Sequence, residues 1–190
     1  MQLVQADEIL TSGPLRLEPI LPHHAALLFD QLQAPQLYIY IPHEPPATLE
    51  ALTKRYQRWA KRQPDDGSEV WLNYAVFHSE EARYLGTVQA SLMANGETYI
   101  AYETFPHAWR RKIAQSACRA LITHLFSAYQ VEKVSALLDT RNEASWRLLE
   151  SLHFRRTQFI AQADEFKGSI SDEYRYDITR AEWQAEVVSL

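Results

Sequence analysis

Apolar and polar side chains alternate in the middle of this 190-residue chain, a pattern typical of β-strands. From residue 87 to 92, apolar side chains at even positions alternate with polar ones at odd positions, within a predicted strand at residues 84–93. An apolar segment at residues 71–77 predicts another strand. Asn95-Gly96 is typical of a hairpin turn in which both central residues accept a positive φ. With a returning strand at residues 97–105, these segments predict an antiparallel meander.

Helical spacing of apolar side chains appears on both sides of this meander. A helix follows Pro45 and Pro46, and we expect these prolines in its first turn, where proline is tolerated. A longer apolar stripe follows Pro106 and runs from Ile113 to Phe126. The other expected elements are a helix at residues 142–152, a helical stretch between residues 25 and 32, and strands at residues 15–20, 132–138, 154–161 and 172–178.

The order of these elements predicts an α/β fold with a mixed central sheet and helices on both faces. The length fits one domain over residues 1–190, with a core at about residues 15–178. A hydrophobic fraction of 46% and a charged fraction of 23% are ordinary for a globular protein. We find no repeat or linker that would divide the chain.

A local basic run stands out against the net charge of −5, which argues against a general nucleic-acid binder. Arg110, Arg111 and Lys112 are consecutive at the expected start of the helix after Pro106. A helix start has unpaired N–H groups and a partial positive charge, so it can hold an anion. Cations are disfavoured there unless an anion binds. A solvated basic helix start is the alternative interpretation.

The remaining composition bears on location and metals. Cys118 is the single cysteine, so no intrachain disulfide can form, as in a reducing compartment. The first ten residues include Asp7 and Glu8 and lack the features of a signal peptide. No apolar run approaches the roughly 18 residues of a membrane span. We therefore expect a cytoplasmic protein without a membrane partner, and the histidine spacing predicts no metal.

Two segments resemble the GNAT acetyltransferase superfamily, and within it the ribosomal-protein alanine N-acetyltransferases. Residues 99–117 are similar to its acetyl-CoA-binding strand–loop–helix. Residues 139–154 (DTRNEASWRLLESLHF) are similar to its Asn-x-x-Ser…Gly-Phe segment. The likeness extends over residues 15–178. It implies the GNAT fold, in which a parallel pair of strands at residues 99–105 and 132–138 splays apart around acetyl-CoA as co-substrate.

The resemblance also implies which residues hold the co-substrate. Main-chain groups near residues 103–105 would pair with the pantetheine arm, N–H groups of residues 110–114 would hold the pyrophosphate, and Asn142 would approach the pantetheine or the adenosine side. The cofactor-binding residues expected on this basis are Glu103, Phe105, Arg110, Arg111, Lys112, Ile113, Ala114 and Asn142.

The family usually has glycine at the positions of Arg110 and Lys112. If these positions need unusual backbone angles, each non-glycine residue costs about 1–2 kcal/mol. Contacts from Arg and Lys to phosphate return about 1.5–3 kcal/mol each. Full cofactor binding, weakened binding and a non-catalytic descendant therefore remain open alternatives.

Acyl transfer to an amine needs a neutral amine and a hydrogen-bond donor for the leaving thiolate. The resemblance implies a serine and a downstream acid for these roles, at positions that match Ser145 and Asp164, with Glu165 as the alternative base. Otherwise Ser145 would satisfy a helix end, and Asp164 would be a solvated loop acid. The tyrosine of many other members is replaced here by Leu149.

These residues predict an acetyl-CoA-dependent N-acetyltransferase that acts on an amine, either a protein N-terminus or a small molecule. The alternative hypothesis is a non-catalytic GNAT-fold module that binds acyl-CoA or another anion. Tyr38, Tyr40 and His43 lie where the superfamily commonly builds acceptor specificity, although they could equally be loop aromatics that pack on the core. A homodimer through an edge strand near residues 174–178 is a further hypothesis.

Overall fold

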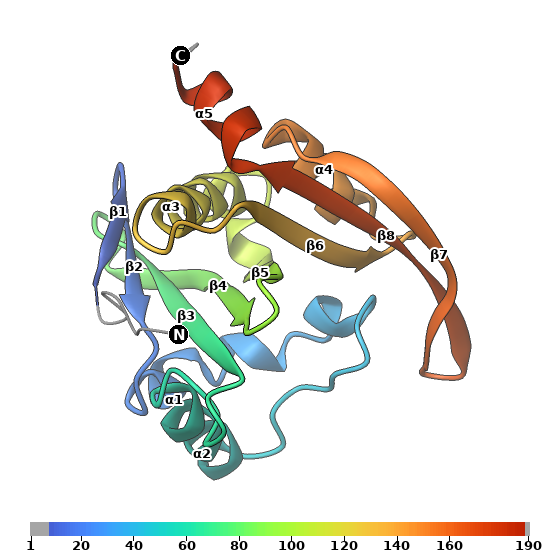
Figure 1. Cartoon of the computed structure of the whole chain (residues 1–190). Coiled ribbons are helices and arrows are strands. Elements are labelled where there is room, and N and C mark those ends of the chain that lie inside the picture. The colour runs from blue at the N-terminus through green and yellow to red at the C-terminus, as the bar shows by residue number, and fades with distance from the viewer. Residues whose placement is uncertain (1–7, 189–190) are drawn as a thin grey trace.

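In a computed structural model, residues 8–188 are described, and they contain one mixed sheet of eight strands (Figure 1). The strand order is β1-β2-β3-β4-β5-β6-β8-β7, in which β5 and β6 are the parallel pair. The strands are β1 (Leu10–Ser12), β2 (Leu15–Pro19), β3 (Glu69–His78), β4 (Arg83–Met93), β5 (Thr98–Thr104), β6 (Lys133–Asp139), β7 (Arg155–Phe166) and β8 (Ser169–Thr179). The α-helices are α1 (His24–Leu28), α2 (Leu49–Trp59), α3 (Ile113–Ser127), α4 (Glu143–Ser151) and α5 (Arg180–Val188). Short 3-10 helices are η1 (Gln31–Gln33), η2 (Pro35–Tyr38) and η3 (Pro106–Ala108).

Helices cover both faces of the sheet, with α1 and α2 on one side and α3 on the other (Figure 1). The larger apolar core lies against α3 and includes Leu121 and Leu125. The smaller core lies under α1 and α2 and includes Leu52 and Phe105. The predicted α/β class, the meander of β3, β4 and β5, and the parallel pair are therefore confirmed.

Helices α1 and α2 cover only part of their face of the sheet. Beyond β4, this face is polar. Side chains of β5, β6 and β8 point there at alternate positions, as strand geometry requires. They include Tyr99, Glu103, Ser135, Asp139, Glu173, Arg175 and Asp177, which we call the polar face. Arg175 connects these strands, because its guanidinium contacts Ser135 at 3.0 Å and Asp177 at 3.0 Å.

The prediction that Pro45 and Pro46 occupy the first turn of a helix is wrong. Helix α2 begins at Leu49, and its N-cap is Thr48, whose Oγ1 accepts a hydrogen bond from Ala51 N–H at 3.1 Å. Proline has no side-chain acceptor that could make this cap. The two prolines therefore lie in the irregular segment before the helix.

The turn between β4 and β5 also differs from the prediction. Gly96 has a positive φ of 89°, but Asn95 does not. Gly96 N–H donates to the Met93 carbonyl at 3.0 Å, and Asn95 Oδ1 accepts from Glu97 N–H at 3.0 Å. Met93 N–H donates to the Glu97 carbonyl at 2.8 Å, so the hairpin closes over the three residues 94–96. Glycine takes the left-handed position of this loop, and the asparagine side chain stabilises it locally.

The hairpin of β7 and β8 is longer than predicted, and it extends past the end of β6 (Figure 1). Strand β8 lies between β6 and β7, so residues 174–178 are not at a sheet edge. The hypothesis of a dimer contact through that segment is therefore wrong, because β7 is the edge strand at that end of the sheet. A homodimer formed in another way stays a prediction.

Other expectations concern membranes, metals and the N-terminus. None of the helices within residues 8–188 has the length and apolarity to cross a membrane. The same residues hold no group of three or more His, Cys, Asp or Glu side chains placed to bind a metal ion. The segment in which we expect no signal peptide lies largely in residues 1–7, outside the described residues.

Candidate active site

Strands β5 and β6 separate soon after they pair, which leaves a gap in the sheet. They share one bridge, between Tyr99 and Ser135, whereas β4 pairs with β5 at seven positions from Gly86 to Leu92. Beyond that bridge, main-chain groups on the β6 side of β5 have no strand partner. Such groups need another hydrogen-bonding partner, which a ligand in the gap could supply.

Main-chain groups at the end of β5 point alternately toward β4 and toward this gap. Phe105 N–H donates to the Leu85 carbonyl at 2.9 Å, and the Glu103 carbonyl also faces β4. These two predicted residues therefore use those groups within the sheet. The alternation directs the main-chain groups of Tyr102 and Thr104 toward the gap.

The loop between η3 and α3 has the backbone shape expected of glycines. Trp109 Nε1 donates to the Thr104 carbonyl at 2.6 Å, which anchors the start of the loop on the end of β5. Arg110 and Lys112 have φ angles of 60° and 59°, in the left-handed region. Two non-glycine residues in that region cost about 1–2 kcal/mol each. The unusual backbone angles considered for these two positions in the sequence analysis are therefore present.

Helix α3 begins with open hydrogen-bond donors beside this loop. Lys112 is its N-cap and makes no side-chain capping bond. The first bonded amide is Ser116 N–H, which donates to the Lys112 carbonyl at 3.0 Å. The N–H groups of Ile113, Ala114 and Gln115 lack intrahelical acceptors, so with the helix dipole they can hold an anion. The Ile113 side chain is buried, so its contribution is limited to the main chain.

The three consecutive cations of the loop have different surroundings. The Arg111 guanidinium bonds to Glu81 in the β3–β4 turn, at 3.3 Å through Nη1 and also through Nη2. Arg110 and Lys112 are exposed and form no ion pair with any residue from 8 to 188. Their charges are therefore available to an anionic ligand, whereas that of Arg111 is already paired.

The start of α4 contacts β5 beside the gap. Asn142 is the N-cap, and its Oδ1 accepts from Ser145 N–H at 3.2 Å. The Tyr102 hydroxyl lies 2.8 Å from Ser145 Oγ and donates to the Ser145 carbonyl at 3.1 Å. Burial raises the pKa of Tyr102, so the phenol stays protonated. Asn142 and Ser145 are thus together, and Tyr102 joins them, although the sequence analysis missed it.

Glu103 presents its carboxylate on the polar face, one residue after Tyr102. It is partly buried, and its Oε1 accepts a hydrogen bond from the Thr87 hydroxyl at 3.0 Å. Burial raises the pKa of Glu103, and the Thr87 bond offsets this only in part. A carboxyl whose pKa is raised toward neutrality is suited to general-base chemistry.

Asp164 lies in β7 and not in a loop. Its Oδ1 accepts from the N–H of the neighbouring Glu165 at 2.8 Å, and its side chain is partly buried. Burial raises the pKa of Glu173 on β8, and the charges of Asp164 and Asp139 raise it further. The order of the sheet places β6 and β8 between β5 and β7, so the strand that carries Asp164 is not adjacent to the strand that carries Glu103.

The tip of the β7–β8 hairpin reaches the segment before α2. Lys167 Nζ donates to the carbonyls of Tyr38, Ile41 at 3.3 Å and His43 at 3.2 Å, and lies 3.4 Å from a Glu44 carboxylate oxygen. An ammonium group has three donors, so these carbonyls can satisfy it. The segment that we associated with acceptor specificity is therefore fixed to the hairpin.

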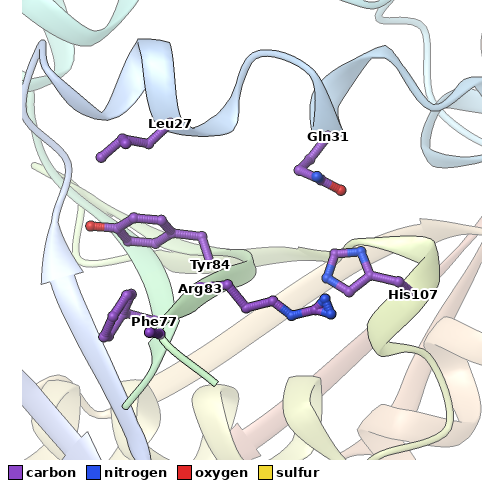
Figure 2. Close-up of a pocket in the computed structure, with 7 residues that line it drawn as sticks. Leu27, Gln31, Phe77, Arg83, Tyr84 and His107 are labelled. Atoms are coloured by element: carbon purple, nitrogen blue, oxygen red, sulfur yellow. The ribbon is translucent and has the colours of Figure 1, made fainter. Parts of the chain in front are cut away.

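A pocket of about 480 Å³ lies elsewhere, between α1, the β3–β4 hairpin and η3. Figure 2 shows its apolar and its polar lining at opposite ends, namely Leu27, Phe77 and Tyr84 at one and Gln31, Arg83 and His107 at the other. None of the predicted catalytic or cofactor-binding residues lines it. This pocket is therefore distinct from the gap between β5 and β6.

Residues 14–155 match a family model described as an acetyltransferase (GNAT) domain. The chain belongs to the GNAT family. The match covers the gap, the loop and the start of α4, so the resemblance seen in the sequence is confirmed.

Two relatives of this GNAT chain are named as uncharacterized N-acetyltransferases. YoaA from Bacillus subtilis (strain 168) is 24% identical over 174 residues, which are 90% of this chain and 97% of that protein. The p20 protein from Bacillus licheniformis is 23% identical over 112 residues, which are 58% of this chain. The match to p20 spans 63% of that protein's length.

Solved structures share the fold. RimL, a ribosomal L7/L12 α-N-protein acetyltransferase in complex with coenzyme A, superposes with a TM-score of 0.80 at 19% identity, covering 90% of this chain and 98% of RimL. Mycobacterium smegmatis RimJ in complex with a CoA disulfide has a TM-score of 0.79 at 17% identity, covering 96% of this chain and 92% of RimJ. At these identities the likeness establishes the fold alone.

Proposed function

We propose that this GNAT chain transfers the acetyl group of acetyl-CoA to an amine, either a protein N-terminus or a small molecule. The observation that carries the proposal is the loop at residues 109–112. It keeps the left-handed angles at Arg110 and Lys112 and leads into an open helix start beside the gap. The coenzyme A in the RimL and RimJ structures is consistent with this use of the fold.

Each part of the site would hold a different part of acetyl-CoA, which supplies an activated acetyl group when bound. The N–H groups at the start of α3, with Arg110 and Lys112, would hold the pyrophosphate. The main-chain groups of Tyr102 and the N–H of Thr104 would pair with the pantetheine arm, whereas the Thr104 carbonyl already accepts from Trp109 Nε1. Asn142 would act indirectly, because its capping bond fixes the helical turn that carries Ser145.

Two side chains, Ser145 on α4 and Glu103 on β5, would transfer protons on opposite sides of the sheet. Ser145 Oγ and the Tyr102 hydroxyl are 2.8 Å apart and either can donate, so their O–H bonds can rotate to free the serine proton for the leaving thiolate. Glu103 would accept the proton of the acceptor amine from the polar face. This assignment places the base on the splayed strand itself, whereas the sequence resemblance favours Asp164.

The direct test is stabilisation by acetyl-CoA. At a 100-fold excess over Kd, acetyl-CoA is expected to stabilise the protein by about 2.7 kcal/mol, or roughly 5–11 °C in Tm. Acetyl-pantetheine lacks the pyrophosphate and is expected to give a much smaller shift. Release of free thiol, followed with a panel of small amines and peptides with free N-termini, then measures transfer.

The outcomes separate the competing functions. Stabilisation without thiol release for any amine would favour a non-catalytic acyl-CoA-binding module, for which the missing glycines are the supporting observation. Equal stabilisation by acetyl-CoA and acetyl-pantetheine would contradict the assignment of the loop to the pyrophosphate. An unchanged Tm at millimolar acetyl-CoA would refute both the transferase and the binding module.

Glu103→Gln is expected to lower kcat about tenfold at pH 7, because an α-amine of pKa near 8 is only about one-tenth neutral there. The pKa of Glu103 is raised, so wild-type activity should fall as the pH drops through that value and the carboxyl becomes protonated. The variant should instead show an acid limb at the pKa of the amine, about 8, and approach wild-type rates above it. The measurement is a pH profile of kcat.

Asp164→Asn is the comparison for this prediction. It should change kcat by less than about threefold, since the carboxylate lies on β7 and accepts a bond from its own neighbour. A large loss in Asp164→Asn with little change in Glu103→Gln would reverse the assignment of the base.

Three expectations from the sequence stay predictions. They are a location in the cytoplasm, one domain over residues 1–190, and the lack of nucleic-acid or membrane partners.

A further inference from the structure

Glu81 sits in the turn between β3 and β4 and is fixed by that hairpin. Its N–H donates to His78 Nδ1 at 3.3 Å, and its Oε2 accepts from Arg83 Nε at 3.2 Å. Both partners belong to the strands that flank the turn, and His78 is buried. Glu81 is therefore a positioned carboxylate on a rigid part of the fold, and it also bonds to Arg111.

Arg111 lies between the two left-handed residues of the loop. The side chains of Arg110 and Lys112 make no hydrogen bond or ion pair with residues 8–188 that would hold their backbone in that region. Side-chain bonds reach the loop at its start, from Trp109 to the Thr104 carbonyl, and at its centre, from Arg111 to Glu81. The anchor at the centre adjoins both strained residues directly.

We infer that Glu81 is a positioning residue for the co-substrate loop, because its ion pair with Arg111 holds Arg110 and Lys112 in angles that glycine would adopt freely. This inference rests on the proposed function, since the loop is taken to hold the pyrophosphate. It assigns a role to a turn that lies outside the loop and explains how the site keeps its shape without glycine.

The alternative role of Glu81 is to compete with the ligand for the Arg111 guanidinium, which would weaken binding. If Arg111 served mainly as a phosphate ligand, Glu81 would withhold that cation and weaken binding. Removal of the carboxylate would then tighten binding of coenzyme A. The two roles therefore predict changes of opposite sign in the same measurement.

Glu81→Gln is expected to raise the Kd for coenzyme A about tenfold, since two left-handed residues must then be held without the ion pair. Calorimetric titration with coenzyme A measures this without turnover. Glu80→Gln is the matched control, because Glu80 is exposed, adjacent and without a hydrogen bond or ion pair to the described residues. It should change Kd by less than about twofold. Tighter binding in Glu81→Gln, or an equal change in both variants, would overturn the inference.

Glu81→Gln in two further variants of the loop distinguishes an effect on backbone strain from an effect on charge. In Arg110→Gly/Lys112→Gly, glycine accepts the left-handed angles at no steric cost, so Glu81→Gln should change Kd by less than about twofold. In Arg110→Gln/Lys112→Gln, the charges are gone but the strain remains, so the roughly tenfold effect should persist. An equal effect of Glu81→Gln in both backgrounds would refute a positioning role.

Hydrogen exchange of the ligand-free protein gives a readout that does not need coenzyme A. Loss of the left-handed cap at Lys112 should loosen the bond from Ser116 N–H to the Lys112 carbonyl, which is 3.0 Å long. Exchange at Ser116 should therefore rise about threefold or more in Glu81→Gln and stay unchanged in Glu80→Gln. If exchange at Ser116 rises in Glu81→Gln but the wild-type protein does not bind coenzyme A, the proposed function alone is refuted. Unchanged exchange would refute the role of Glu81.

Discussion

Ser145→Ala is expected to lower kcat about 100-fold and to leave the Kd for acetyl-CoA within about twofold, the range typical of a lost proton donor. The Ser145 hydroxyl contributes no cap to α4, because the capping acceptor is Asn142 Oδ1. Its removal should therefore affect proton transfer and not the helix. Steady-state thiol release gives kcat, and calorimetry with acetyl-CoA gives Kd.

Tyr102→Phe provides the control for this prediction, because it removes the hydroxyl partner of Ser145 and keeps the ring. Loss of one hydrogen bond worth about 1 kcal/mol should lower kcat about fivefold in the wild-type background. In the Ser145→Ala background it should have no further effect on kcat, since the partner is already absent. A fivefold loss in both backgrounds would mean that the Tyr102 hydroxyl acts independently of Ser145 Oγ, through its bond to the Ser145 carbonyl. A fully active Ser145→Ala would remove the serine from the mechanism.

The sequence predicted most of the fold because its patterns are local. The alternation at residues 87–92 and the stripe that ends at Phe126 each report which face of one element is buried. The conformations of the loops were harder to predict from the sequence. Thr48 became the N-cap of α2 in place of a proline start, and Asn95 kept a negative φ because Gly96 alone adopts the left-handed conformation of the turn. Such choices depend on hydrogen bonds between specific atoms, which hydrophobic periodicity does not encode.

The site shows the same division between local and distant information. The capping role of Asn142 lies within one helical turn, and the burial of Leu149 follows from the helix pattern. The contact between Tyr102 and Ser145 joins residues 43 positions apart, and a single sequence carries no signal for it. The direction of the Glu103 side chain depends on strand register, which a shift of one residue would reverse. Sequence motifs therefore located the strand–loop–helix, and the structure distinguished the roles within it.

Gly86→Ala is expected to lower the free energy of unfolding by about 3 kcal/mol, at the upper end of the range for overpacking, and Tm by roughly 6–12 °C. A Cβ on Gly86 would lie 2.2 Å from the Glu103 carbonyl oxygen and 2.9 Å from the Thr104 Cα. Both are backbone atoms, so the strand ends must move apart. Strand β4 has a β-bulge at Leu85, because Val76 pairs with Gly86 and Phe77 pairs with Tyr84. Chemical denaturation and calorimetry measure the loss.

Gly96→Ala separates this close approach from the general effect of replacing glycine. Gly96 has a positive φ of 89° and no atom within 4 Å of an added Cβ, so its substitution should cost only about 1 kcal/mol. The larger loss at Gly86 would then come from contact with β5. Because the end of β5 is joined to the loop at residues 109–112 through η3 and the Trp109–Thr104 bond, Gly86→Ala should also weaken coenzyme A binding, whereas Gly96→Ala should not. Equal Tm values for the two variants would show that β4 and β5 can separate freely, and that the end of β5 does not depend on glycine at position 86.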